Sequence, residues 1–227
     1  MPFFTKSLVA LSIAAAVGCS VVSSSTKSAD IKDIAPAVEV ETAESTTKGL
    51  QTAVFGGGCF WGLEAVFEHV KGVTDVKSGY SGGAAKTADY DQVSEGDTGH
   101  AEVVKITFDP AVVSYKELLA VFFAVAHDPT ELNRQGPDTG SQYRSAIFYS
   151  TEEQKTQAAA YINEMTTAKT LAKPIVTEVT PLKAFYNAEA YHQDYLVRHP
   201  DQPYIVINDK PKVEDLKTRF PALYVGK

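Results

Sequence analysis

The stretch "VFGGGCFWG" (residues 54–62) decides the fold, because a strand pattern changes there into a helical one. Residues 52–55 form a short apolar run that ends in glycines, as an interior strand does. Apolar side chains then recur at helical spacing before Gly72, at Phe60, Leu63, Phe67 and Val70. The sequence therefore predicts a strand, a glycine turn and a helix, with Cys59 where the helix begins.

The rest of the folded region alternates between the two patterns. Residues 101–108 ("AEVVKITF") alternate strictly, which places Glu102 on the same strand face as Val104, Ile106 and Phe108. Further strands are expected within 73–83, which leaves through a glycine-rich turn, at 146–149 and at 175–179, and helices at about 114, at about 150 and over 189–197. We predict an α+β fold, a two-layer α/β sandwich with a mainly antiparallel mixed sheet arranged as a ferredoxin-like plait. The tail from His199 shows little periodicity and is expected to wrap the surface.

The N-terminal region differs from the rest. Lys6 precedes an apolar run at 8–17 and then Cys19, which is typical of a signal peptide over residues 1–19 with lipoprotein-like cleavage at Cys19. Ala16 stands where such lipoproteins usually have leucine, so a cleaved soluble export signal and an unprocessed N-terminus are the alternatives. Residues 20–48 are rich in small and polar side chains, as in a flexible linker, and one folded domain covers 49–227.

These features predict an exported protein of the bacterial cell envelope, periplasmic or attached to a membrane by a lipid on Cys19. The net charge of -7, from 21 basic and 28 acidic side chains, argues against nucleic acid as a partner. No metal ligand set is recognised, and a monomer is expected.

The folded domain contains a single cysteine, Cys59, which has no partner for an internal disulfide. An arbitrary cysteine of this kind is most often a small buried hydrophobe. A helix N-terminus, however, favours thiolate over thiol, and preceding glycines let the chain turn sharply. The same turn could in principle hold a phosphate, although the lysine and hydroxyl of a P-loop are missing. A nucleophilic role for Cys59 is therefore favoured.

Four further residues could support chemistry at Cys59. If the apolar face of residues 101–108 is buried, Glu102 has a raised pKa and can serve as a general acid. Trp61, the only tryptophan, lies off the apolar stripe of its helix and is better placed to line a pocket. Tyr90 and Tyr143 lie in polar loops, where their hydroxyls are free to donate hydrogen bonds.

Several segments taken together resemble the A class of peptide methionine sulfoxide reductases. These segments run in order from 54 to 196: "GGGCFWG", "GYSGG", "YDQVSEGDTGHAEVVKITFDP", "HDPTELNRQGPDTGSQYRSAIFY" and "AEAYHQDYL". The resemblance implies an α/β two-layer sandwich that reduces the S epimer of methionine sulfoxide, free or in oxidised proteins. Repair of proteins after oxidative stress would follow.

The resemblance also implies a role for each site residue. Cys59 would attack the sulfoxide sulfur and Glu102 would protonate the departing oxygen. Tyr90 and Tyr143 would hydrogen-bond that oxygen, and Asp138 would join their polar network. Phe60 and Trp61 would form the pocket for the S-methyl group.

The C-terminal tail departs from many family members, because it has no cysteine to close a disulfide. We therefore expect the sulfenic acid on Cys59 to be resolved by an external thiol: thioredoxin, a glutaredoxin-like protein or a small thiol. No bound cofactor is expected.

Three other functions remain to be separated from this one. A cysteine hydrolase would need a histidine beside Cys59, for which His100 is the best candidate. A thiol peroxidase would use a lone cysteine but would need no aromatic methyl pocket. A surface-tethered peptide-binding module would carry Cys59 as an inert thiol.

Overall fold

The computed structural model describes residues 49–226. The predicted signal peptide at 1–19, its lipidation candidate Cys19 and the linker at 20–48 lie outside the described residues. The strands are β1 (Gln51–Gly56), β2 (Val73–Ser81), β3 (Ala101–Phe108), β4 (Arg134–Gln135), β5 (Asp138–Thr139), β6 (Ala146–Tyr149), β7 (Glu178–Pro181) and β8 (Tyr186–Asn187). The helices are α1 (Phe60–Glu68), α2 (Tyr90–Ser94), α3 (Tyr115–Val121), α4 (Glu152–Ala168), α5 (Tyr195–Arg198) and α6 (Lys210–Arg219). Shorter helical turns cover Ala85–Thr87, Phe122–Ala126, Ser141–Tyr143 and Ile205–Asp209.

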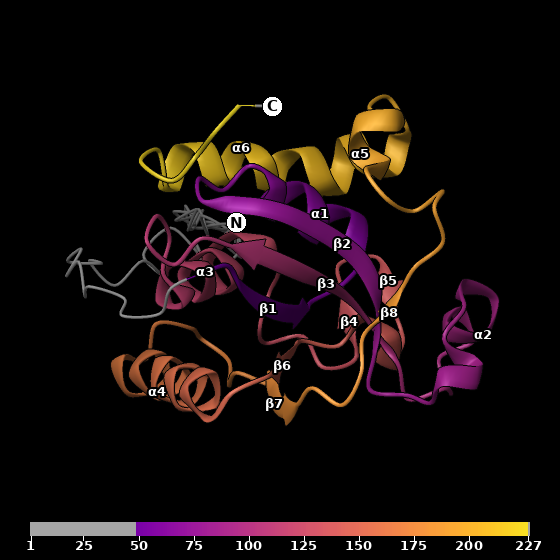
Figure 1. Cartoon of the computed structure of the whole chain (residues 1–227), viewed down its shortest axis with the longest axis horizontal. Helices are drawn as coiled ribbons and strands as arrows, with labels where there is room; N and C mark the ends of the chain where they lie inside the picture. Colours follow the sequence, from indigo (N-terminus) through magenta and orange to yellow (C-terminus); the bar gives the residue numbers. More distant parts are fainter. Residues whose placement is uncertain (1–48, 227) are drawn as a thin grey trace, which may run out of the picture.

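Within residues 49–226, six strands form one sheet in the order β7-β6-β1-β3-β2-β8 (Figure 1). All neighbouring strands are antiparallel except the parallel pair of β6 and β7. The central order β6-β1-β3-β2, with α1 between β1 and β2 and α3 between β3 and β6, is that of a ferredoxin-like plait. The predicted mixed, mainly antiparallel two-layer sandwich is therefore confirmed.

The two sheet faces bury different side chains of the same strands. On β3, Val104, Ile106 and Phe108 pack in the large core beneath the helices, whereas Ala101 and Val103 lie in a smaller cluster on the opposite face. The strict alternation read from the sequence is therefore confirmed. It places Glu102 on the helix-covered face, where 2% of its surface is exposed.

Helix α6 (yellow in Figure 1) contacts α1 at the top of the view, whereas α2 stands apart at the edge. The prediction of a tail with little regular structure is wrong, because α6 occupies Lys210–Arg219. The sequence shows no clear apolar period over α6, because Leu216 is the one residue of this helix that is buried. The tail returns along α1 and thereby reaches the region around Cys59.

The expected helix over 189–197 is also shorter in the structure. Only Tyr195–Arg198 is helical, because Asp194 has a left-handed backbone conformation with φ of 53°. The Gln193 side chain is tied to Ser78 of β2 by two hydrogen bonds of 3.0 Å. Residues 188–194 therefore form a turn that packs against the sheet edge.

Among the helices of residues 49–226, none combines the length and the apolar character that a membrane span requires.

Candidate active site

The glycine turn places Cys59 at the N-cap of α1 and packs tightly against its surroundings. Gly58 has φ of +94°, and a Cβ there would lie 2.7 Å from the Gln135 side chain. A Cβ on Gly57 would lie 2.8 Å from the ring of His127. The glycines are therefore needed for the left-handed backbone and for close packing against the 127–145 loop.

The structure corrects the expectation that the helix N-terminus makes Cys59 a thiolate in the free protein. Burial raises the pKa of the Cys59 thiol well above its usual value, and the nearby acids Glu102, Asp209 and Asp138 raise it further. The backbone N–H of Trp61 lowers that pKa but does not outweigh burial. Only 8% of the Cys59 surface is exposed, so a thiolate there loses more stabilisation by water than the first backbone amides of α1 supply.

Glu102 reaches the start of α1 from the buried face of β3. The backbone N–H of Phe60 donates a hydrogen bond of 3.0 Å to Glu102 Oε2. Burial raises the pKa of Glu102 to about 8, although the Phe60 hydrogen bond opposes the shift. The carboxyl group is therefore mostly protonated at neutral pH, as the strand alternation predicted.

An aromatic wall lies beside Cys59. The Trp61 indole stacks on Tyr195 with ring centroids 3.7 Å apart and planes at 5°, and it meets the Tyr204 ring edge-on at 5.9 Å. Phe60 is fully buried against Tyr80, with ring centroids 5.8 Å apart. Trp61 thus faces away from the core stripe of α1, as its position in the sequence predicted.

Phenols and a carboxyl group line the cavity as well. Tyr90 begins α2, Tyr143 ends the turn before β6, and Asp138 lies on β5. Burial raises the pKa of both Tyr90 and Tyr143, so both hydroxyls stay protonated and can donate hydrogen bonds. The Tyr204 hydroxyl donates a short hydrogen bond to Asp138 Oδ2.

All these side chains meet in one cavity of about 190 Å³. It is lined by Cys59, Phe60, Trp61, Tyr90, Glu102, Asp138, Tyr143 and Tyr204. The structure therefore brings together all seven site residues predicted within the described part of the chain. A nucleophile, a neutral acid and several hydroxyl donors share this cavity with apolar aromatic rings, a combination suited to a small group that is polar at one end.

Sequence reasoning missed two residues of this region. Tyr204 lies in the tail, where no periodicity distinguished it from the other tyrosines. His192 falls within the helix expected over 189–197 and nothing else in the sequence distinguishes it, yet it is 2% exposed and contacts both Trp61 and Tyr90. Both residues lie more than a hundred positions after Cys59, so only the tertiary fold shows their place.

Two alternative functions do not fit this geometry. His100 accepts a hydrogen bond from the Gly83 N–H at 3.3 Å and donates to the Ala84 carbonyl at 3.0 Å, so it is not paired with Cys59 as a hydrolase would require. The Phe60 amide is occupied by Glu102, and the glycines pack on protein atoms, so the turn offers no phosphate cradle.

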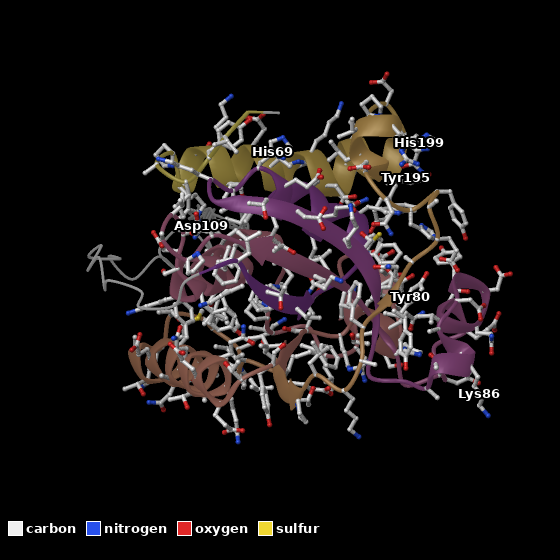
Figure 2. All side chains as sticks on the ribbon, in the orientation of Figure 1. His69, Tyr80, Lys86, Asp109, Tyr195 and His199 are labelled. Carbon is white, nitrogen blue, oxygen red and sulfur yellow. The ribbon has the colours of Figure 1, made fainter. Side chains whose placement is uncertain are left out.

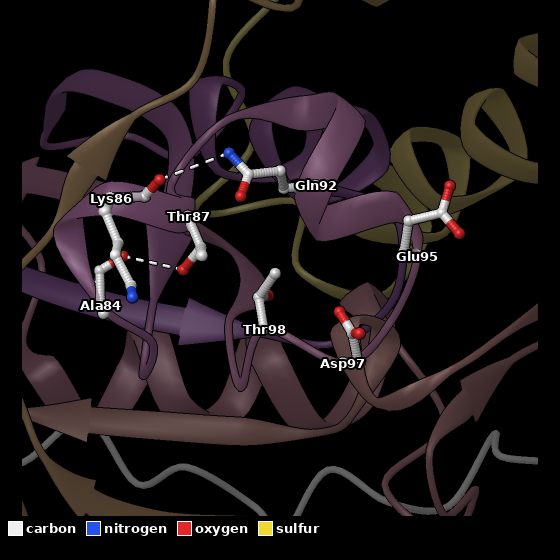
Figure 3. A pocket seen from close by; sticks show the side chains of 7 residues that line it. All are labelled: Ala84, Lys86, Thr87, Gln92, Glu95, Asp97 and Thr98. Carbon is white, nitrogen blue, oxygen red and sulfur yellow. Dashed lines mark hydrogen bonds between the residues drawn. The ribbon is translucent and has the colours of Figure 1, made fainter.

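A second hollow, of about 510 Å³, lies beside α2 (Figure 3). It is lined by Ala84, Lys86, Thr87, Gln92, Glu95, Asp97 and Thr98, and it shares no residue with the Cys59 cavity. Its side chains include no nucleophilic thiol. Within residues 49–226, no three His, Cys, Asp or Glu side chains gather as metal ligands.

Comparisons with known proteins agree with the site. The family model for peptide methionine sulfoxide reductase matches residues 51–223. The MsrA 2 protein of Mesorhizobium japonicum is 55% identical over 184 residues, which cover 81% of this chain and 94% of that protein. The MsrA 2 protein of Synechocystis is 52% identical over 185 residues, covering 82% of this chain and 86% of that one.

Solved structures show the same fold. Reduced Mxr1 from Saccharomyces cerevisiae superposes with a TM-score of 0.62 at 34% identity, covering 67% of this chain and 87% of that one. Methionine sulfoxide reductase A of Corynebacterium diphtheriae gives a TM-score of 0.58 at 35% identity, covering 68% and 77%. The chain therefore belongs to the A class of the peptide methionine sulfoxide reductase family.

Proposed function

We propose that Cys59 is the nucleophile and Glu102 the general acid of the methionine sulfoxide reduction that this chain catalyses. The observation that carries the proposal is the cavity in which a lone thiol and a buried carboxyl with a pKa of about 8 lie together. A sulfoxide oxygen leaves readily only after protonation, so a protonated acid beside a nucleophile is what the reaction needs.

The cavity orients the substrate because the S-methyl group and the sulfoxide oxygen differ in polarity. The S-methyl group contacts the apolar wall of Phe60 and Trp61, while the sulfoxide oxygen faces Glu102, Tyr90 and Tyr143. Preorganised donors of this kind contribute about 2.7 to 4 kcal/mol each to a transition state. Asp138, hydrogen-bonded by Tyr204, completes the polar side. Because these groups surround sulfur asymmetrically, the site accepts one epimer, and membership of the A class implies that this is the S epimer.

Because burial raises the pKa of Cys59, the thiol proton must be included in the balance of the reaction. The Cys59 sulfur bonds to the sulfoxide sulfur, and the hydroxyl formed by protonation of the oxygen then moves to the Cys59 sulfur. The S–O bond and the new S–S bond break in this transfer, which leaves a sulfenic acid on Cys59. Glu102 gives its proton to that oxygen and recovers the proton that the thiol loses. Methionine is released, the substrate sulfur having gained the two electrons that Cys59 has lost.

An oxidised peptide tests this mechanism. Incubation with a methionine S-sulfoxide peptide and dithiothreitol should remove one oxygen mass from the peptide, and Cys59→Ser should abolish the loss. Without thiol, one equivalent of dimedone adduct should form on Cys59. The assignment is contradicted if Cys59→Ser still reduces the peptide.

An external thiol would then regenerate the enzyme. It displaces water from the sulfenic acid to form a mixed disulfide, and a second thiol releases reduced Cys59 and the external disulfide. The proposal is supported by the sequence, in which Cys19 is the only other cysteine. Thioredoxin, a glutaredoxin-like protein and small thiols are the candidate reductants. Alkylation and mass analysis after one turnover would contradict this route if they found a bond between Cys19 and Cys59.

Export to the cell envelope is the corresponding proposal for the N-terminal region. It is supported by the signal-like pattern at 1–19 and the linker-like composition of 20–48. Mass measurement of the mature protein should show a chain that begins at Cys19 and carries acyl groups. A chain that still begins at Met1 would contradict export by this route.

A further inference from the structure

The turn at residues 188–194 ("AEAYHQD") supports the cavity without lining it. Its contacts centre on His192, whose surface is 2% exposed and whose ring lies among four aromatic side chains. The ring centroid is 5.0 Å from Phe60, 5.8 Å from Trp61, 4.4 Å from Tyr90 and 4.2 Å from Tyr191. Two of these neighbours form the apolar wall and one is a proposed hydroxyl donor.

One directional contact fixes the orientation of the wall. The Trp61 indole N–H donates a hydrogen bond of 3.1 Å to His192 Nδ1. To accept this bond His192 must be neutral, with its proton on Nε2, and burial lowers its pKa in agreement. The Nε2 atom lies 3.9 Å from Glu189 Oε2.

Glu189 extends the same support to the polar side. Its Oε2 accepts a hydrogen bond of 2.9 Å from the Tyr80 hydroxyl, and its Oε1 accepts one of 2.9 Å from the backbone N–H of Tyr90. The turn therefore holds the first residue of α2 while His192 holds the indole of Trp61. The apolar wall and one donor come from elements far apart in the sequence, and this turn joins them.

We propose that His192 is a positioning residue: by accepting the indole N–H of Trp61 and packing on Tyr90, it fixes the methyl-binding wall relative to the sulfoxide-oxygen donor. The inference rests on the proposed role of Trp61 in binding the S-methyl group. It assigns His192 no contact with the substrate.

The single tryptophan gives a direct readout of this contact. In the ¹H–¹⁵N spectrum the chain has one indole N–H signal, that of Trp61. We expect the indole proton to exchange with solvent about tenfold faster or more in His192→Leu, which removes the acceptor. His192→Asn, whose amide can place an acceptor at the position of Nδ1, should keep slow exchange. Equal exchange in wild type and His192→Leu overturns the proposal.

Kinetics test the consequence for substrate. His192→Leu should raise KM for the sulfoxide peptide about fivefold, the value of one hydrogen bond, with a smaller change in single-turnover rate, and His192→Asn should restore KM. In a double-mutant cycle with Trp61→Phe, which lacks the N–H, the effect of His192→Leu should largely disappear. Additive effects of the two substitutions overturn the positioning role.

A buried histidine outside the cavity provides the matched control. His69 is 8% exposed and stacks on Tyr224 with ring centroids 5.8 Å apart, well separated from Tyr195 beside Trp61 (Figure 2). His69→Leu should leave indole exchange and KM unchanged even if it lowers stability. If Trp61→Phe alone leaves KM unchanged, the methyl-wall function fails, whereas the exchange result still decides the His192 contact.

Discussion

The backbone N–H of Phe60 donates a hydrogen bond of 3.0 Å to Glu102 Oε2, which ties β3 to the first residue of α1. Because Phe60 follows Cys59 directly, this one contact holds the Glu102 carboxyl group close to the Cys59 thiol. The Phe60 amide bonds only to Oε2, so it does not occupy Oε1, the other oxygen of the Glu102 carboxyl group. A protonated Glu102 can thus keep its place at the helix start and still present its proton to the cavity.

Glu102→Gln should slow single-turnover reduction by about 10² or more, because an amide keeps the hydrogen-bonded position but donates no acidic proton. In the wild type the rate should fall as pH rises through about 8, where the carboxyl group loses its proton. Rapid-quench measurement of methionine formation across this pH range checks both statements.

Glu64→Gln is the control for that experiment. Burial also raises the pKa of Glu64 to about 8, but Glu64 accepts a hydrogen bond from the Asp194 N–H and does not line the cavity. Its replacement should leave the rate and its pH profile close to those of the wild type. If Glu64→Gln slows the reaction as much as Glu102→Gln does, Glu102 affects the rate only by stabilising the fold.

The same pKa shift predicts how stability depends on pH. The folded-state pKa of Glu102 is raised from 4.5 to about 8, so between these values the folded protein holds a proton that the unfolded chain has released. The free energy of unfolding therefore falls as pH rises through this window, by up to about 1.4 kcal/mol per pH unit for this group. Urea denaturation of Glu102→Gln from about pH 5 to pH 8 should show a shallower fall, and an unchanged slope would disprove the shift.

The strand and helix that frame the site could be predicted from local pattern. Alternation along residues 101–108 placed Glu102 on the buried face, and the shift to helical period placed Cys59 at the start of α1. Such patterns are visible because each element turns its larger apolar side chains toward the main core at the period of its own backbone geometry. Asp138 came from the resemblance alone. Tyr90 and Tyr143 stood out only as phenols in polar loops and took their role from the resemblance, since loops carry no comparable period.

The parts that sequence did not predict depend on contacts between distant segments. Tyr204 reaches the cavity only because the tail returns along α1, and His192 reaches the residues that line it only because the 188–194 turn bonds to β2. The direction of the Cys59 pKa was wrong for a related reason. A helix N-terminus is a local feature, whereas burial and the surrounding acids are properties of the assembled fold.

Gly58→Ala should destabilise the domain by about 2 to 4 kcal/mol, combining a left-handed backbone penalty with overpacking. The new Cβ would lie 2.7 Å from the Gln135 side chain. Gly136→Ala is the matched control, since Gly136 also has positive φ, 52°, but no atom lies within 4 Å of its added Cβ. Urea denaturation compares them, and equal losses would show that the close contact with Gln135 has no cost.

Cys59 should react slowly with iodoacetamide at neutral pH in the absence of substrate. Its alkylation rate should rise with a midpoint above pH 9.0, because burial disfavours the thiolate. Asp209 is fully buried and raises the pKa of Cys59, so Asp209→Asn should move the midpoint to lower pH. A wild-type midpoint near neutral pH would instead favour the helix N-terminus as the dominant influence.

Tyr204→Phe should lower kcat/KM about tenfold, since it removes the hydroxyl that donates to Asp138 while keeping the ring against Trp61. Loss of that donor raises the pKa of Asp138, because the Tyr204 hydrogen bond favours the carboxylate. The loss of activity should therefore depend on pH in the acid range, where Asp138 gains a proton. Tyr195→Phe keeps the stack on Trp61 and is the control, with activity expected close to wild type. Steady-state assays with the sulfoxide peptide compare the two variants. If Tyr204→Phe is as active as Tyr195→Phe, the Tyr204 hydroxyl does not contribute to the reaction.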